Sequence, residues 1–271
     1  MRKLIFYEWQ KISNDLWILD TVTNGYKIEF SVFPNYSSFL PEIQFSTEKA
    51  EIVTAEVSKL LAKGAIKKVF AVDGQFISNL FLVPKKDGTL RPVINLKKWN
   101  LYVEYQHFKQ EHLAFALDLI QKDDFLTSID LTDAYFSLSI HDDFKKYLRF
   151  SWNKQIHVYE FQVLCFALAS APRVFTKVLK PVYAFFRKLG IRCIYYIDDS
   201  LNMEQDFDKC KDNTNIMVQK LDDHGYRINR KKSVLIPTKR IVFIGLIIVF
   251  LTDEKVDKII SLGRKMLLSD V

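Results

Sequence analysis

The stretch "CIYYIDDSLNM", residues 193–203, places two adjacent carboxylates, Asp198 and Asp199, directly after an apolar run. Aromatic and β-branched residues, a short polar turn and a second alternating run together predict a β-hairpin with both acids at its tip. Most aspartate pairs in turns are simply hydrated, because Asp tolerates turn geometry. Here an apolar strand leads into the pair, so we expect the acids at the edge of a core, where a cation would offset their repulsion.

A third acid ends another predicted strand. Residues 125–129, "FLTSI", predict a short apolar strand that ends at Asp130, after which Thr132 and Asp133 suit the cap of a brief helical turn. An antiparallel sheet could lay the two acid-tipped strand ends side by side. Carboxylates so placed would bind two divalent cations, one activating an attacking hydroxyl and the other steadying a leaving pyrophosphate, as in nucleotidyl transfer. Unrelated turn acids are the alternative interpretation.

The composition indicates a folded, basic protein. Of the 271 residues, 49% are hydrophobic, which is ample for a packed interior and argues against disorder. The formal net charge of +7 favours a polyanionic partner, because basic surfaces gain affinity by releasing counterions from phosphates. Basic residues gather in two runs, residues 85–98 and 227–240, each of which is either a solvated face or part of a nucleic-acid-binding face.

The sequence predicts an intracellular protein, in the cytoplasm or nucleus, that neither enters a membrane nor is secreted. The three cysteines are Cys165, Cys193 and Cys210. They are odd in number and too far apart for a zinc motif, which favours a protein whose cysteines stay reduced. The N-terminal apolar segment is interrupted by Glu8, which argues against a signal peptide. The longest apolar run, residues 241–251, is too short to span a bilayer, and we interpret it as a buried strand.

Helices and strands alternate irregularly along the chain. Apolar residues at helical spacing and helix stop signals predict helices over residues 47–64, 170–190 and 206–224. Turn signals between apolar runs predict hairpins over residues 80–95, with a basic tip, and over residues 147–161. This order is neither a series of repeated βα units nor a run of strands alone, so the predicted class is α+β.

Six segments, in order along the chain, resemble the motifs of reverse transcriptases, which are RNA-directed DNA polymerases. "YIDD", residues 196–199, resembles the YxDD box of that family, and "LTSIDLTDAYFSLSI", residues 126–140, resembles its first catalytic motif. The other four are "FLVPKKDGTLRPVINLKKWN" (81–100), "LCFALASAPRVFTKVL" (164–179), "GYRINRKKS" (225–233) and "FIG" (243–245). Residues 9–30 and 170–181 further resemble retrotransposon polymerases of the DIRS type.

The resemblance implies a right-hand polymerase fold with an antiparallel palm sheet backed by helices. It implies an N-terminal segment and fingers over residues 1–105 and 137–169, a palm over residues 106–136 and 170–250, and the start of a truncated thumb over residues 251–271. Asp130, Asp198 and Asp199 match the catalytic, metal-binding acids, with the Leu131 carbonyl as a further ligand. The implied cofactor is Mg²⁺, with Mn²⁺ as a substitute.

The resemblance also implies residues that meet the nucleotide and the primer. Lys85 and Arg91 match cations that clamp the triphosphate. Tyr135 matches an aromatic gate that crowds a ribose 2′-OH, with a buried core tyrosine as the alternative. The other matches are Asp133 and Ala134, through backbone amides at the triphosphate, Phe166 against the sugar, Lys232 as a proton donor to pyrophosphate, and Tyr196, Phe243 and Gly245 at the template and primer.

The implied function is addition of deoxynucleoside triphosphates to a primer on an RNA or DNA template; the sequence leaves the oligomeric state open. Cys165 and Ala167 depart from the usual Pro and Gly of the template-side loop, and the primer grip looks shortened because no polar turn lies between residues 248 and 251. The alternative is an impaired retroelement remnant that only binds nucleic acid. A third candidate is a nucleotidyl cyclase or a metal nuclease. The fingers motif at residues 81–100 argues against both, because neither class of enzyme needs it.

Overall fold

The protein is described by a computed structural model over residues 2–34, 38–39, 43–84, 88–111, 113–153 and 157–250. The chain forms two compact units, each assembled from segments that are distant in sequence. The first unit comprises Met1–Gln110, Thr132–Val182 and Leu221–Arg227, and the second comprises Glu111–Leu131, Tyr183–Lys220 and Ile228–Val271. None of the described helices is both long and apolar enough to cross a membrane.

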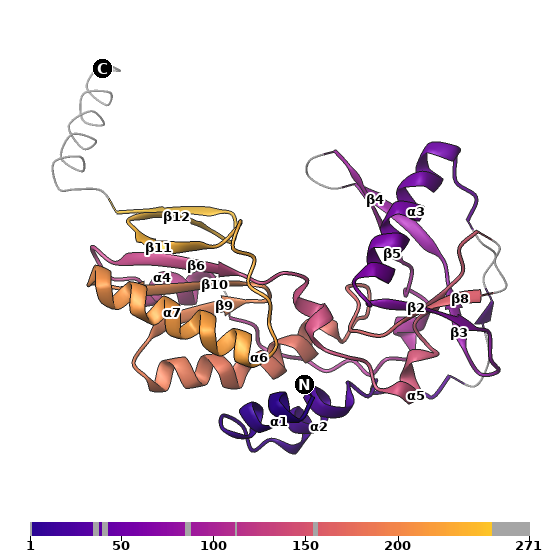
Figure 1. Ribbon diagram of the computed structural model, residues 1–271, viewed down its shortest axis with the longest axis horizontal. Coiled ribbons are helices and arrows are strands. Elements are labelled where there is room, and N and C mark those ends of the chain that lie inside the picture. The colour runs from indigo at the N-terminus through magenta and orange to yellow at the C-terminus, as the bar shows by residue number, and fades with distance from the viewer. Residues whose placement is uncertain are drawn as a thin grey trace, which may run out of the picture. The chain divides into compact units, whose positions relative to one another are not determined.

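The second unit is built on one antiparallel sheet. Its strands are β6 (Phe125–Asp130), β9 (Arg192–Tyr196), β10 (Asp199–Glu204) and β11 (Val234–Thr238). They are ordered β11-β6-β10-β9, so both acid-bearing strands lie in the middle of the sheet (Figure 1). The hairpin predicted at residues 193–203 is confirmed as β9 and β10, and the strand predicted to end at Asp130 is confirmed as β6.

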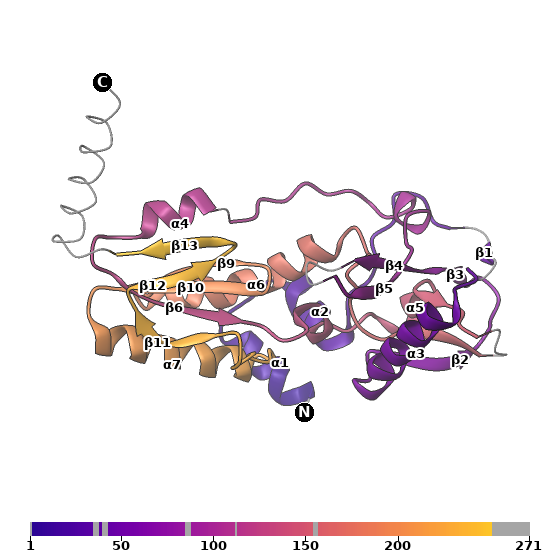
Figure 2. The same cartoon turned by 90° about the horizontal axis from the view of Figure 1, so that it is seen from above.

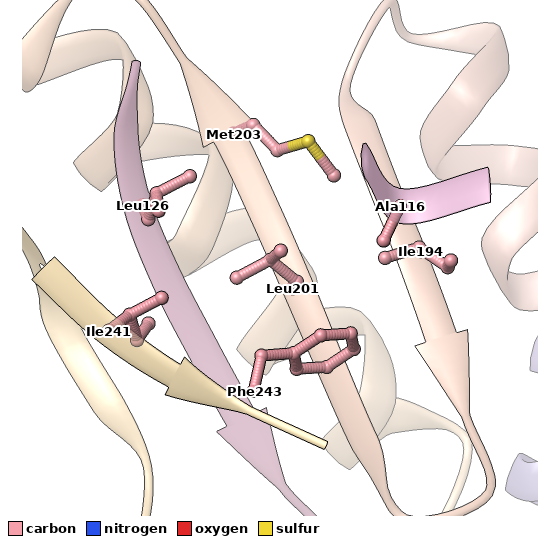
Figure 3. Packing of buried hydrophobic residues seen from close by; sticks show 7 residues of the cluster. All are labelled: Ala116, Leu126, Ile194, Leu201, Met203, Ile241 and Phe243. Atoms are coloured by element: carbon pink, nitrogen blue, oxygen red, sulfur yellow. The ribbon is translucent and has the colours of Figure 1, made fainter. Parts of the chain in front are cut away.

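One face of this sheet carries the apolar core of the second unit. Side chains two residues apart in a strand share a face, which explains why alternate apolar residues of β6, β9 and β10 gather there. Helix α4 (Leu113–Leu119) and strand β12 (Arg240–Phe243) complete the cluster. Its fully or almost fully buried members are Ala116, Leu126, Ile194, Leu201, Met203, Ile241 and Phe243 (Figure 3).

The opposite face of the sheet is partly polar and is covered by α7 (Phe207–Asp223). The side-chain amide of Asn202 in β10 donates to the Thr127 hydroxyl of β6 at 3.2 Å and to the Thr214 hydroxyl of α7 at 3.1 Å. The Thr127 and Thr214 hydroxyls are 2.7 Å apart and hydrogen-bonded. Buried polar contacts of this kind bind the helix to two neighbouring strands in one register.

The apolar run from residue 241 is a hairpin, so the prediction of a single buried strand is wrong. Strands β12 and β13 (Leu246–Val249) pair antiparallel around Ile244 and Gly245, which have φ of +48° and +79°. Two positive φ values characterise the two-residue turns of tight hairpins. Val242 and Ile247 are exposed on the outer side, and the hairpin overlies the sheet (Figure 2). Uniformly apolar residues concealed the turn in the sequence.

The first unit contains a five-stranded sheet and a separate hairpin. In the sheet, β1 (Ser38–Phe39), β3 (Phe76–Ser78), β7 (Arg149–Phe150), β8 (His157–Phe161) and β2 (Ile66–Phe70) lie in that order. The hairpin joins β4 (Leu80–Pro84) to β5 (Leu90–Ile94). The hairpins predicted over residues 80–95 and 147–161 are thus confirmed, although residues 85–87 and 154–156 at their tips lie outside the described residues.

The helices of the chain agree with the predicted spans. Those predicted over residues 47–64, 170–190 and 206–224 are confirmed as α3 (Thr47–Ala62), α6 (Ala171–Lys188) and α7. The first unit also holds shorter helices near its sheet and at the N-terminus. These are α1 (Arg2–Gln10), α2 (Leu16–Asn24), α5 (Asp142–Lys145), and the 3₁₀ helices η1 (Trp99–Leu101) and η2 (Ala134–Ser137).

The three cysteines are free and buried. Burial raises the pKa of Cys165 and of Cys193 to about 12. Because the thiolate is the reactive form of cysteine, these thiols are unreactive at neutral pH. They therefore serve as small core residues.

Leu201→Ala is expected to destabilise the second unit by about 2–5 kcal/mol, because it leaves a cavity in the buried cluster beneath the acid-bearing hairpin. Ile247→Ala is the matched control, since this side chain is 61% exposed and its loss should cost less than about 0.5 kcal/mol. Urea denaturation of both variants and the wild type measures the difference. Equal losses in the two variants would contradict the assigned core.

Candidate active site

The turn between β9 and β10 presents Asp198. Tyr196 pairs with Asp199 across the hairpin, so Ile197 and Asp198 are the two turn residues. Ile197 has a φ of +53°, which is rare for a β-branched side chain. Glycine would adopt this conformation at lower cost, so the chain carries local strain next to Asp198.

Asp130 lies directly opposite Asp199 in the pairing of β6 with β10. The N–H of Asp130 donates to Ser233 Oγ at 3.0 Å, and its C=O accepts from the N–H of Asn229 at 2.8 Å. Both backbone groups thus point away from β10, which makes Asp130 and Asp199 a non-hydrogen-bonded pair. In such pairs the facing Cα atoms are about 4.5 Å apart and the side chains are closest.

Asp198 joins this pair through the residue after Asp130. The N–H of Leu131 donates to the C=O of Asp198 at 2.9 Å. On its other side, the backbone of Leu131 forms an isolated antiparallel bridge with Ile228. The structure therefore brings together the two strand ends on which all three predicted acids lie.

The three carboxylates are electrostatically coupled. Burial, followed by the charges of Asp198 and Asp130, raises the pKa of Asp199 to about 6. Desolvation and the charge of Asp130 also raise the pKa of Asp198. The Nζ of Lys232 lies 3.7 Å from Oδ2 of Asp130, and its positive charge lowers both pKa values in part. Additional positive charge at this point would stabilise the ionised acids.

These oxygen donors fit a hard divalent cation such as Mg²⁺. The raised pKa values of Asp198 and Asp199 reflect a place where bound positive charge is favourable. Within the described part of the chain, no group of three His, Cys, Asp or Glu side chains is arranged as a complete metal site. Mg²⁺ is commonly held by one or two carboxylates together with substrate phosphates and water, so the donor set matches its chemistry.

An aromatic cluster with one cation lies in the first unit. The ring of Phe166 is 55% exposed, and its centre is 4.9 Å from the ring centre of Tyr135. The guanidinium carbon of Arg91 lies 5.9 Å from the centre of the Phe166 ring. Tyr135 is only 5% exposed and also contacts Phe175, so it is a buried aromatic residue. Phe166 and Arg91 are the accessible members of this group.

The predicted helical turn is confirmed as η2 with Asp133 at its N-cap position, although the Asp133 side chain makes no capping hydrogen bond. Both oxygens of its carboxylate instead accept hydrogen bonds from Nζ of Lys63, at 2.7 and 2.9 Å. Asp133 has a φ of +49°, in a region that Asp tolerates better than most residues, and the next residue, Ala134, is buried. The sequence signal for Lys63 was only its position in the basic end of a helix, before Gly64.

The other predicted residues differ in accessibility. Tyr196 is half-buried, Phe243 is 2% exposed within the core cluster, and Gly245 forms the β12–β13 turn. Lys85 lies outside the described residues. The second unit holds Asp130, Leu131, Tyr196, Asp198, Asp199, Lys232, Phe243 and Gly245, and the first holds Arg91, Asp133, Ala134, Tyr135 and Phe166.

Two residues of the acid site were not identified from the sequence. Ser233 and Asn229 hold the backbone of Asp130, as described above. Their only sequence signal is their place in "GYRINRKKS", a segment that was interpreted through its basic residues. Their role depends on a contact between segments far apart in the chain.

Comparisons with known proteins agree with this geometry. Residues 83–248 match the family described as "Reverse transcriptase (RNA-dependent DNA polymerase)". The chain is 28% identical over 208 residues to the "Enzymatic polyprotein" of soybean chlorotic mottle virus, covering 75% of this chain and 29% of that protein. It is 25% identical over 184 residues to the "Transposon Tf2-3 polyprotein" of Schizosaccharomyces pombe, covering 68% of this chain and 13% of that protein. The chain thus spans less than a third of either relative.

A solved structure supports the fold. The crystal structure of prototype foamy virus protease-reverse transcriptase resembles this chain with a TM-score of 0.65 and 20% identity, over 82% of this chain and 28% of that chain. At this identity the likeness speaks for the fold alone. The predicted α+β class and right-hand polymerase fold are confirmed.

Asp199→Asn is expected to stabilise the metal-free protein at neutral pH by about 2 °C in Tm. The folded protein raises the pKa of Asp199 to about 6, against about 4 when unfolded, so the folded state binds more protons between these values. The contribution of Asp199 to the stability of the wild type should therefore fall as pH rises from 4 to 6, and the variant should lack this contribution. Thermal denaturation in EDTA at pH 4 and pH 7.5 measures it.

Asp118→Asn, at an exposed position of α4, is the matched control and should behave as the wild type at both pH values. If the difference in Tm between the wild type and Asp199→Asn is the same at pH 4 and pH 7.5, the coupling of the three acids is contradicted.

Proposed function

The chain belongs to the reverse transcriptase (RNA-dependent DNA polymerase) family, and from this premise we propose that it adds deoxynucleotides to a primer 3′-OH at Asp130, Asp198 and Asp199. The observation that carries the proposal is the pairing of Asp130 with Asp199, with Asp198 in the adjoining turn. Three acids on two neighbouring strand ends would supply the oxygen ligands that nucleotidyl transfer requires.

The proposed cofactor is Mg²⁺, for which Mn²⁺ can substitute. The side chains of Asp130, Asp198 and Asp199 would hold it, with the carbonyl of Leu131 as a further oxygen ligand. When bound, the metal lowers the pKa of the primer hydroxyl and neutralises charge on the phosphates. Lys232, whose Nζ lies 3.7 Å from the Asp130 carboxylate, would give a proton to the leaving pyrophosphate.

The proposed substrates are deoxynucleoside triphosphates and a primer on an RNA or DNA template. A net charge of +7 supports a phosphate-rich partner. On the nucleotide side, Arg91 would bind the triphosphate by charge-assisted hydrogen bonds and Phe166 would pack against the sugar. Lys85, Asp133, Ala134 and Tyr135 are proposed to complete that side, and Tyr196, Phe243 and Gly245 to support template and primer.

Finer assignments are also proposals. The segments at residues 9–30 and 170–181 support a retrotransposon polymerase of the DIRS type, acting in the cytoplasm or nucleus. The first unit would correspond mainly to fingers and the second mainly to palm, with the boundaries at residues 105, 136, 169 and 250 given above. Sequencing the DNA that flanks the gene would test the subfamily by the presence of a tyrosine recombinase.

Asp198→Asn should abolish primer extension on an RNA template with Mg²⁺ or Mn²⁺, lowering the rate by about 10³-fold or more, because the ligand charge at the hairpin tip is lost. Asp118→Asn, which removes an exposed acid of α4, should retain the wild-type rate. Gel analysis of extended primers measures both. Equal extension by wild type and Asp198→Asn, or none by either, would leave only a nucleic-acid-binding remnant.

Arg91→Ala should raise KM for the deoxynucleoside triphosphate by about tenfold, because one charge-assisted contact to phosphate is lost. Arg91→Lys should recover part of this affinity, since lysine keeps the positive charge but lacks the planar guanidinium that can form two parallel hydrogen bonds. Steady-state kinetics with varied nucleotide measure the change. An unchanged KM in both variants would exclude Arg91 from the nucleotide site.

A further inference from the structure

The segment after α7 turns tightly beside the end of β6. The N–H groups of Lys232 and Ser233 both donate to the C=O of Asn229, at 3.1 and 2.9 Å. The following strand, β11, begins its pairing with β6 at Val234, which lies opposite Ser128. Asp130 is two residues beyond that pair. On the β11 side of β6, its backbone therefore finds hydrogen-bond partners in the turn at residues 229–233 rather than in β11.

Three groups of this turn hold Asp130. The Ser233 hydroxyl oxygen accepts the N–H of Asp130 at 3.0 Å, and the Asn229 N–H donates to its C=O at 2.8 Å. The Nζ of Lys232 lies 3.7 Å from the Asp130 carboxylate. The residue is thereby fixed from the side that faces away from Asp199.

Ser233 supplies the only one of these contacts that both orders the backbone and depends on a side chain. The Asn229 contact comes from its main chain, and the Lys232 side chain is 70% exposed, so solvent screens it. Asp130 and Asp199 share no backbone hydrogen bond, and like charges placed opposite each other destabilise strand pairing. If the Ser233 hydroxyl were removed, the N–H of Asp130 would lose its hydrogen-bond partner. The repulsion between Asp130 and Asp199 would then act on a less restrained strand end.

We propose that Ser233 is a positioning residue, whose hydroxyl oxygen fixes the backbone of Asp130 so that its carboxylate stays opposite Asp199 and shares a divalent cation with it. Ser233 acts through Asp130. The inference rests on the proposed function, since the cation belongs to it. Contacts behind metal ligands commonly change metal affinity by about 10- to 100-fold when they are removed.

Mn²⁺ binding by the whole chain without nucleic acid, followed by the electron paramagnetic resonance signal of free Mn²⁺, tests the proposal. Ser233→Ala should raise the Kd about tenfold or more, and Ser233→Thr, which keeps the acceptor, should stay within about twofold of the wild type. Ser200→Ala is the matched control: its hydroxyl donates to the C=O of Ile129 at 3.3 Å in the same sheet. This control should lower Tm while leaving the Kd within about twofold.

Equal Mn²⁺ affinity in wild type and Ser233→Ala would overturn the proposal, and so would equal weakening in Ser233→Ala and Ser200→Ala, which would assign the effect to general sheet stability. Amide hydrogen exchange of the wild type gives a second measurement that does not need the variant to fold. The Asp130 N–H should be protected, and exchange at the rate of an unstructured peptide would also overturn the role of Ser233.

The two proposals fail in different ways. A wild type that binds no Mn²⁺, or binds it equally after Asp198→Asn, overturns the proposed function and this inference with it. A wild type that binds Mn²⁺ and extends primers, while Ser233→Ala does both equally well, overturns the role of Ser233 alone.

Discussion

The antiparallel pairing of β6 with β10 is the constraint on which the candidate site depends, because it sets Asp130 opposite Asp199. A slip of one residue would turn one carboxylate to the other face of the sheet. Both faces resist such a slip. Leu201 is buried in the apolar cluster on one side, and Asn202 is hydrogen-bonded beneath α7 on the other. Packing at the next residues along β10 thus decides how the acids meet.

This arrangement opposes stability at the candidate site. Burial, followed by repulsion from the other two acids, raises the pKa of Asp199 to about 6, and Ile197 holds a backbone conformation that costs a β-branched residue free energy. Neither feature would persist in an isolated hairpin. The buried cluster beneath the strands and the turn at Asn229 and Ser233 offset these costs, which is a common relation between a rigid scaffold and a strained site.

Much of the fold was predictable, for reasons that differ between elements. The hairpin at residues 193–203 has alternating apolar residues and a polar tip, and α3 has helical spacing and a stop signal, so each is specified locally. The apolar run from residue 241 was predicted as a single strand, because its turn consists of Ile244 and Gly245 and contains no polar residue. Asp133 occupies the expected cap position, but its side chain binds Lys63 at the end of another helix, and local sequence does not reveal that partner.

The sequence by itself determined which acids end strands, the class of the fold and the family, because alternation, turn residues and motif spacing act over short stretches of chain. Only the tertiary structure decided what surrounds those acids. Ser233 reaches Asp130 across 103 residues, and Lys63 reaches Asp133 across 70. Such contacts are set by how separate segments pack, and the cost of closing the intervening chain is met by the whole core rather than by the residues that touch.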